Sequence, residues 1–334
     1  MRNMDKFLFF YKRGGLLCAV LHSLNKVLRI ILHIHSDQRP YMGNTFYTYF
    51  KDLPKEWYQN ELQEQLHLFF PDRGRLNLSH PVTFNEKNQW LKIWDSTPIK
   101  TRLADKYAVR EWIAEQIGDE YLIPLVGGPW EKGEDIDFDA LPERFVLKSN
   151  HASGDIIVVK NKNQINQKKI IRAVNHWLKT MFGWEGLEAQ YFHIPPRIIA
   201  EEFMEQSDGN LLDYKINCLN GEPLLIQVLG DRNLSNHTGK TAFYDTNWNL
   251  LEYNIGVYPD YDHPIDKPEK LEEMLQIARQ LSKEFIYVRV DLYCVNNRVK
   301  FGEMTFTPGN GLLPWNPAEA DLLMGELLKL PYER

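Results

Sequence analysis

Apolar residues recur at helical spacing between Leu16 and Leu32, with polar residues on the opposite face. The apolar positions are Leu17, Val20, Leu21, Leu24, Val27, Leu28 and Ile31. This pattern predicts an amphipathic helix. Charged residues interrupt it before it reaches the roughly 18 apolar residues typical of a membrane-spanning helix, and no small-residue cleavage site follows. We therefore expect neither a transmembrane helix nor a secretory signal.

The same N-terminal stretch is basic. Within residues 1–40 the cations are Arg2, Lys6, Lys12, Arg13, Lys26, Arg29 and Arg39, against Asp5 and Asp37. Periodicity leaves two interpretations open. The helix either packs on the body of the protein or on a second subunit of a homo-oligomer, or residues 1–35 lie peripherally on an anionic membrane surface.

Hydrophobic patterning changes along the chain. Residues 52–117 are polar and amphipathic in a helical manner, with breaks at Pro71, Pro81 and Pro98. From Phe145 onward, short β-rich runs alternate with helical stretches near 164–182 and 268–285. The runs are FVLK, DIIVVK, RIIAEEFM, DYKINCL, PLLIQVL, YVRVDLYCV and VKFGEMTF. Asn220-Gly221 and Asn296-Asn297 are typical hairpin turns, so we expect an α+β fold with mainly antiparallel sheets.

Composition and simple motifs exclude several classes of function. The net charge is −6 and the pI is near 6.0, which gives no basic field for nucleic acid. The three cysteines, Cys18, Cys218 and Cys294, form neither a CxxC pair nor a zinc spacing, which favours a reducing cytoplasm. No GxxxxGK[ST] loop and no GxGxxG loop is present, so any nucleotide is bound in another way.

Three segments carry candidate chemistry, and the first is Phe145 to Lys160. Lys148 ends a strand and is followed by a small polar loop, Ser149 to Gly154. Backbone N–H groups of such a loop can contact phosphate oxygens while the lysine supplies a charge. An ordinary hairpin turn between two strands is the alternative.

The second segment, Arg197 to Met204, is an apolar run that ends in Glu201 and Glu202. A strand that becomes a connector could offer backbone groups to an adenine edge, with Phe203 and Met204 beside the base. Glu205 or Asp208 would then bind the ribose. Two solvated glutamates at a strand end explain the segment equally well.

The third segment contains two strands joined by Asn296-Asn297. The period of two places Arg289, Asp291 and Tyr293 on one face, and Glu303 and Thr305 on one face of the next strand. Two neighbouring buried carboxylates repel unless a cation neutralises them, and hard oxygen ligands suit Mg²⁺ beside phosphates. A structural ion pair of Arg289 with either acid is the alternative. The flexible loop Thr307 to Gly311 follows and could line an acceptor pocket.

The order of these segments resembles the ATP-grasp superfamily, and more narrowly the TupA-like ATP-grasp family, named for teichuronopeptide biosynthesis. The motifs that carry the resemblance are Asp105 to Arg110, Phe145 to Lys148, Asp213 to Lys215, Arg289 to Tyr293 and Phe301 to Thr307. The resemblance runs from about Pro81 to near the C-terminus. It implies two α+β lobes that clasp ATP. The expected division is 1–50 basic helix, 51–140 helical acceptor region, 141–204 small lobe with the phosphate loop, and 205–334 large lobe with the metal site.

The resemblance also implies residue roles. Nucleotide binding falls to Lys106, Lys148, Ser149, His151, Ser153, Gly154, Glu201, Glu202, Phe203, Met204 and Asp208. Metal binding falls to Asp291, Glu303 and Thr305, and catalysis to Arg289, Lys215 and Lys148. Many ATP-grasp ligases carry Asn where Thr305 stands, which leaves the geometry of a second Mg²⁺ open.

The function that follows is an ATP- and Mg²⁺-dependent carboxylate–amine ligase that forms an amide and ADP. The family association suggests an amine or amino acid joined to a uronic acid of a bacterial surface polysaccharide, in the cytoplasm or at the inner face of the membrane. A sugar kinase-like phosphotransferase, a glycosyltransferase or a non-catalytic partner in polysaccharide assembly are the alternatives.

Overall fold

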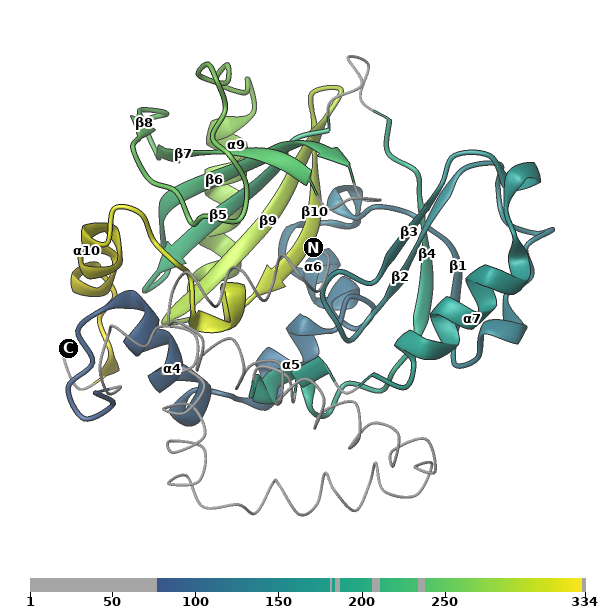
Figure 1. Ribbon diagram of the computed structural model, residues 1–334, viewed down its shortest axis with the longest axis horizontal. Coiled ribbons are helices and arrows are strands. Elements are labelled where there is room, and N and C mark those ends of the chain that lie inside the picture. The colour runs from purple at the N-terminus through teal and green to yellow at the C-terminus, as the bar shows by residue number, and fades with distance from the viewer. Residues whose placement is uncertain (1–76, 181, 184–186, 206–210, 234–237, 332–334) are drawn as a thin grey trace, which may run out of the picture.

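The structure, a computed structural model, describes residues 77–331 apart from 181, 184–186, 206–210 and 234–237. The predicted N-terminal helix, its contact with a membrane or a second subunit, and Asp208 lie outside these residues. Two antiparallel sheets form the framework of the described chain (Figure 1). In this part of the chain, no helix is both long and apolar enough to cross a membrane.

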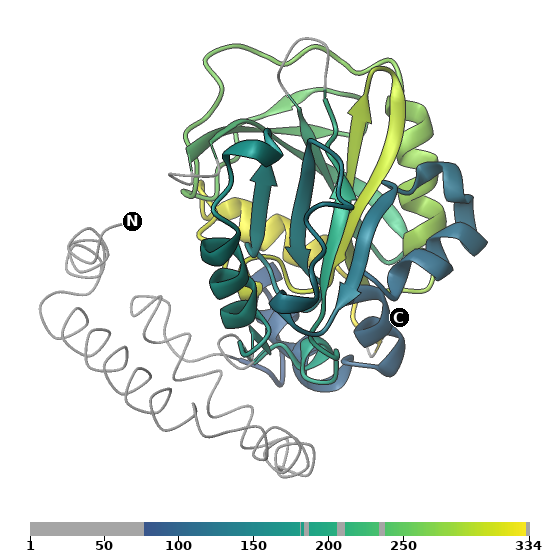
Figure 2. The ribbon, with the colours of Figure 1, turned by 90° about the vertical axis from the view of Figure 1, so that its right-hand side faces the viewer.

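The small sheet has four strands in the order β1-β4-β2-β3. Their bounds are Leu125–Trp130 for β1, Phe145–Ser149 for β2, Ile156–Val159 for β3 and Ile198–Glu202 for β4. Helix α7, Gln167–Trp177, lies along this sheet (Figures 1 and 2) and buries Ile170 and Val174 in the same apolar cluster as Phe145 and Ile198. A backbone connector after β4 leads to the large sheet.

The large sheet has six strands in the order β10-β9-β5-β6-β7-β8. Their bounds are Asp213–Leu219 for β5, Glu222–Asn233 for β6, Thr238–Asp245 for β7, Leu250–Leu251 for β8, Tyr287–Val295 for β9 and Arg298–Thr305 for β10. Every neighbouring pair is antiparallel. Asn220 and Gly221 adopt positive φ between β5 and β6, and Asn296 and Asn297 do so between β9 and β10, so both predicted hairpins are confirmed.

One face of the large sheet is apolar. The alternate residues Val288, Val290 and Leu292 of β9 point to this face and are fully buried. Helix α9, Leu271–Ser282, covers it with Met274, Ala278 and other apolar side chains. The opposite face therefore receives Arg289, Asp291 and their neighbours.

The charged face is bounded at one end by a second apolar cluster. Helix α4, Phe84–Trp94, begins with a capping box between Thr83 and Glu86 and buries Phe84 against Tyr287. Helix α10, Glu319–Leu327, packs on α4. A Cβ on Gly325 would lie 2.1 Å from the Val82 carbonyl oxygen, so only glycine allows this approach.

The remaining elements are short connectors. They are α5 (Pro98–Ala104), α6 (Val109–Ile117), η3 (Asp119–Tyr121), η4 (Gly133–Asp135), η5 (Lys162–Gln164), η6 (Ala189–Tyr191) and η7 (Pro308–Gly311). The α+β class with antiparallel sheets is confirmed. Strand β1 was not expected, because it lies within the region 51–140 that the sequence indicates is helical, so the small sheet draws on that region as well as on 141–204.

Candidate active site

Strand pairing brings the third predicted segment together. Asp291 of β9 lies opposite Glu303 of β10 and, on its other side, opposite Lys215 of β5. Arg289 lies opposite Thr305. The predicted juxtaposition of Arg289, Asp291, Glu303 and Thr305 is therefore correct, and Lys215 joins the same row.

Asp291 is the most buried of these groups, with 1% of its surface exposed. Its Oδ1 accepts from Arg289 Nε at 2.6 Å, and its Oδ2 accepts from Arg289 Nη2 at 2.7 Å and from Lys215 Nζ at 2.5 Å. Burial raises the pKa of Asp291, and the two cations oppose that rise. Both carboxylate oxygens are thus already engaged with cations.

Asp213 was not singled out from the sequence, although it belongs to the same face. Its Oδ2 lies 2.7 Å from Lys215 Nζ and 3.7 Å from Arg232 Nη1. Burial would lower the pKa of Lys215, but Asp213 and Asp291 raise it above its ordinary value. Lys215 is therefore held cationic between two carboxylates.

Glu303 differs from Asp291 because its side chain is 29% exposed and its contacts are longer. Oε1 lies 3.5 Å from Arg289 Nη2, and Oε2 lies 3.5 Å from Lys106 Nζ. Burial would raise the pKa of Glu303, yet Lys106, Lys215, Arg289 and Lys148 together hold it well below the usual range. Glu303 is thus an ionised carboxylate whose oxygens remain accessible.

The small sheet contributes Lys148. Its Nζ lies 2.5 Å from Glu201 Oε2, and Arg110 Nη1 lies 3.8 Å from Glu201 Oε1. Lys148 also lowers the pKa of Glu303, which belongs to the large sheet. The Glu201 side chain serves this ion pair, and its backbone lies in β4 between Leu125 of β1 and Val146 of β2. Its predicted place in an adenine hinge stays a prediction.

The loop after Lys148 is tied down at its base and open at its tip. Asn150 is fully buried; its Nδ2 donates to Asp105 Oδ1 at 2.9 Å and its Oδ1 accepts from Arg197 N at 2.7 Å. Lys106 Nζ donates to the Ala152 carbonyl at 2.5 Å. Ser153 and Gly154 are exposed, and nothing lies within 4 Å of a Cβ built on Gly154. A ligand can approach this tip closely.

Two other predicted loop residues have internal partners. Ser149 is fully buried and its Oγ donates to Asp155 Oδ2 at 2.9 Å. His151 lies with Nδ1 3.2 Å from Asn150 Oδ1 and Nε2 3.2 Å from the Trp177 carbonyl oxygen at the end of α7. Their nucleotide-binding roles stay predictions.

Replacing His151 with Gln is expected to make the free energy of unfolding less dependent on pH in the acid range. Burial lowers the pKa of His151 to about 4, although hydrogen bonds to the backbone of Thr180 and Trp177 act to raise it. The unfolded chain, with its pKa near 6.5, binds more protons between these values, so the free energy of unfolding falls as pH drops through this window. The variant should lose about 3 kcal/mol less than the wild type between pH 6.5 and 4 in urea titrations. Exposed His80→Gln is the control; identical pH slopes for His151→Gln and wild type would refute the burial argument.

A cavity of about 390 Å³ lies where the connector meets the large sheet. Its lining comes from the connector residues Glu202, Phe203, Met204 and Glu205, from Ile123 and Pro124, and from the β9–β10 hairpin. Asn296 Nδ2 of that hairpin donates to the Glu205 carbonyl at 3.1 Å. Phe203 and Met204 thus line a cavity large enough for a base, beside the charged side chains of its other lining residues.

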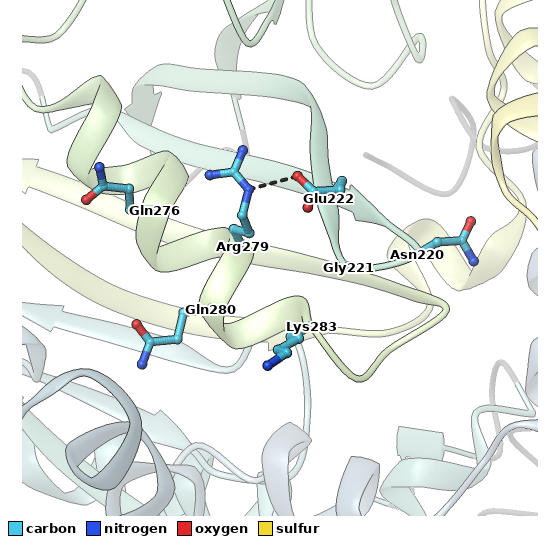
Figure 3. A pocket seen from close by; sticks show the side chains of 7 residues that line it. All are labelled: Asn220, Gly221, Glu222, Gln276, Arg279, Gln280 and Lys283. Atoms are coloured by element: carbon cyan, nitrogen blue, oxygen red, sulfur yellow. Dashed lines mark hydrogen bonds and ion pairs between the residues drawn. The ribbon is translucent and has the colours of Figure 1, made fainter.

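A second hollow, of about 370 Å³, lies at the turn between β5 and β6 beside the end of α9 (Figure 3). It contains an exposed ion pair between Arg279 and Glu222, 2.8 Å apart. The pair is solvated on both sides and contributes little. The charged face of the large sheet, with its buried ion cluster, is the better candidate for chemistry.

A comparison of the sequence with known protein families identifies the family of this chain. The model of the TupA-like ATP-grasp family matches residues 86–329, which include every described residue of the charged face. The chain belongs to the TupA-like ATP-grasp family. The family predicted from the sequence motifs is therefore confirmed.

The solved structures that are similar to this TupA-like chain include three from the following organisms. D-alanine–D-alanine ligase from Bacillus anthracis has a TM-score of 0.40 and 17% identity over 72% of this chain and 74% of that one. N5-carboxyaminoimidazole synthase from Aspergillus clavatus has a TM-score of 0.38 and 10% identity over 73% and 54%. The Helicobacter pylori D-alanine–D-alanine ligase has a TM-score of 0.36 and 16% identity over 68% and 61%. No curated protein matches the sequence.

An ATP-grasp site implies a nucleotide with Mg²⁺, and the oxygen donors of the TupA-like chain fit that ion in part. Within the described residues, no three His, Cys, Asp or Glu side chains form a metal cage. Mg²⁺ usually binds through one or two carboxylates together with substrate phosphates. Glu303 meets this requirement, and Thr305 Oγ lies 3.4 Å from its Oε1. Asp291 would join only with Arg289 or Lys215 displaced.

Proposed function

We propose that this protein is an ATP- and Mg²⁺-dependent ligase that joins a carboxylate to an amine and releases ADP and phosphate. The observation that carries the proposal is the row of charged residues Glu303, Asp291 and Lys215, with Arg289 beside it and Lys106 and Lys148 facing it. Cations that surround an accessible carboxylate can bind the oxygens of a polyphosphate, while the carboxylate binds the metal ion that accompanies it.

The roles of the residues follow from their positions. Lys106 and Lys148 bind the phosphates, and the open tip at Ser153 and Gly154 allows backbone N–H groups to approach phosphate oxygens. Glu303, with Thr305 beside it, would hold the Mg²⁺, which neutralises charge on the phosphates when it is bound. Phe203 and Met204 contact the base.

Arg289 and Lys215 orient the reacting groups. The substrate carboxylate attacks the terminal phosphorus, the bond to ADP breaks, and an amine then displaces phosphate from the acyl phosphate while losing a proton. Arg289 presents a planar guanidinium that is fixed by Asp291 and by Thr305 Oγ at 3.1 Å. Such a fixed cation stabilises charge on the transferring group without rearranging. The protein supplies positioning and charge and needs no covalent nucleophile.

The substrate class extends the proposal. The family is named for teichuronopeptide biosynthesis, which supports a uronic acid carboxylate and an amino acid or amine in the assembly of a bacterial surface polysaccharide. Such a reaction takes place in the cytoplasm, where ATP is supplied. The basic residues 1–35 would hold the enzyme peripherally at the inner face of the membrane.

Mg-ATP is expected to stabilise the protein. At 100 times its dissociation constant, a ligand that binds only the folded state adds about 2.7 kcal/mol to the free energy of unfolding. Thermal unfolding with Mg-ATP, with ATP and EDTA, and with Mg²⁺ alone tests this. We expect the full shift only with Mg-ATP. No shift under any condition would eliminate the nucleotide site and the ligase with it.

The reaction type needs a second measurement. Uronic acids are screened against amines, with ADP release and mass spectrometry as readouts. A ligase forms an amide and requires both substrates. ADP release that needs a sugar but no amine, with a stable phosphoester as product, would replace the ligase by a phosphotransferase.

A further inference from the structure

Helix α4 buries polar side chains that a helix at the edge of a domain would normally expose. These residues are between 0% and 3% exposed: Asn85, Lys87, Asn88, Gln89 and Lys92. Buried polar groups cost free energy unless they are hydrogen-bonded, and apolar residues would fill the same space without that cost. The partners of these side chains therefore indicate what the helix does.

Most partners lie in one loop. Gln89 Nε2 donates to the Asn310 carbonyl at 3.0 Å and to the Gly311 carbonyl at 2.7 Å. Lys92 Nζ donates to the Asn310 carbonyl at 2.6 Å and to its side-chain oxygen. Asn85 exchanges two hydrogen bonds with the backbone of Leu313, at 2.8 and 3.0 Å. The helix thus binds the main chain of residues 310–313.

This loop directly continues strand β10 from Thr305. Its residues Gly309, Asn310 and Gly311 have φ of 56°, 62° and 64°, a left-handed backbone that Asn adopts at some cost. A Cβ on Gly311 would lie 2.6 Å from Gln89 Nε2, so the helix and the loop are in close contact. On its other side, Thr307 Oγ accepts from Gln190 Nε2 at 2.6 Å. External contacts hold this conformation.

We propose that Gln89 and Lys92 are positioning residues that hold the loop 307–311 beside Glu303 and Thr305, so that it forms the acceptor side of the active site. The assignment of the loop to the acceptor side rests on the proposed ligase function. The claim that Gln89 and Lys92 fix the conformation of the loop does not depend on that function. The helix acts on catalysis through the loop, because its side chains reach the carbonyl groups of Asn310 and Gly311.

Two observations support a role beyond packing. The amide nitrogen and oxygen of Asn88 have no hydrogen-bond partner among the described residues, although the side chain is fully buried beside Gly311. Burial lowers the pKa of Lys92 to about 7, against the charge of Glu188. Apolar side chains would fill the same space without the cost of burying these polar groups, and such costs are common at residues that serve a function.

The helix offers a matched control. Lys87 is as buried as Lys92, at 3% exposure, and lies on the same helix. Its Nζ donates to the Leu328 carbonyl at 2.8 Å, at the end of α10. Lys87→Met and Lys92→Met thus remove equivalent buried ammonium groups with different partners.

The test is hydrogen–deuterium exchange of the full chain. The amides of Asn310 and Leu312 are hydrogen-bonded within the loop, and the amide of Leu313 donates to Asn85 of α4; in Gln89→Leu and Lys92→Met all three should exchange at least tenfold faster. Lys87→Met should leave their rates unchanged. Equal acceleration in Lys87→Met, or unchanged loop exchange in both other variants, would overturn the positioning role.

The active-site part has its own readout. With a carboxylate–amine pair from the substrate screen, Lys92→Met should raise the KM for the acceptor or lower kcat at least tenfold while the KM for ATP stays within twofold. The Mg-ATP thermal shift should equal that of the wild type. A loss of ATP binding in Lys92→Met, with an intact shift in the wild type, would overturn the assignment of the loop to the acceptor side. A missing shift in the wild type refutes the ligase proposal instead.

Discussion

Glu303→Gln is expected to lower the rate of ADP formation by about a thousandfold while leaving the protein folded. The carboxylate is the accessible oxygen donor on the charged face, and its charge balances Lys106 and Arg289. A loss of about 4 kcal/mol of transition-state stabilisation corresponds to this factor, a reasonable size for one group that organises metal and phosphate charge. Coupled ADP assays and thermal unfolding measure both effects.

The control for this variant is Glu222→Gln. Glu222 of β6 also pairs with an arginine, Arg279 of α9, with 2.8 Å between Glu222 Oε2 and Arg279 Nε. This pair lies at the hollow of Figure 3, away from the charged face. Its removal should change neither activity nor stability measurably, since exposed ion pairs contribute little. Near-normal turnover of Glu303→Gln would show that the metal and phosphates bind elsewhere.

Asp291→Asn is expected to be both inactive and unstable, with the free energy of unfolding lowered by about 3–5 kcal/mol. The substitution leaves the Arg289 guanidinium facing a neutral amide in a buried site, where an unpaired charge is costly, and leaves Lys215 with Asp213 as its remaining close carboxylate. Urea unfolding measures the loss of stability, and ADP assays at a temperature where the variant is folded measure the loss of activity.

A companion variant separates the two effects of Asp291. Adding Arg289→Met to Asp291→Asn removes the cation that Asp291 binds through both of its oxygens, and should restore part of the stability without restoring ADP formation. If Asp291→Asn alone were as stable as the wild type, the ion cluster would not be maintained in solution. If the double variant were active, neither residue would belong to the catalytic machinery.

Local patterns in the sequence predicted the strand-borne part of the site. Alternation along β9 and β10 fixes which side chains share a face, so the residue pattern alone was enough to place Arg289, Asp291 and Glu303 together. The hairpin turns followed from Asn-Gly and Asn-Asn in the same way. These features depend on neighbours in the chain.

Other features depend on segments far apart in the sequence. Strand β1 escaped prediction because Gly127, Gly128 and Pro129 are poor strand residues, and tertiary pairing with β4 overrides that preference. The pairing of Glu201 with Lys148 required the register of two strands, which the alternation of one strand does not determine. Asp213 and Lys215 lie two residues apart on β5, so alternation along that strand could have placed them together.

The different surroundings of Asp291 and Glu303 also could not be predicted without the three-dimensional structure. From alternation alone, Asp291 and Glu303 are equivalent carboxylates on one face. The structure engages both oxygens of Asp291 with cations and leaves Glu303 partly exposed, so their substitutions should have different costs. Burial and partner geometry, which carry this difference, have no counterpart in the residue pattern.

Lys106 belongs to neither sheet, yet it contacts the Ala152 carbonyl beside the small sheet and Glu303 on the large one. Together with Lys148, Lys215 and Arg289, it surrounds Glu303 with positive charge. A divalent cation arriving alone would compete with these cations for Glu303, the partly exposed carboxylate, whereas the phosphates of a nucleotide would bind the cations and leave Glu303 to the metal ion. We therefore expect the nucleotide to bring or precede its Mg²⁺, and excess free Mg²⁺ to have little affinity for the enzyme without nucleotide.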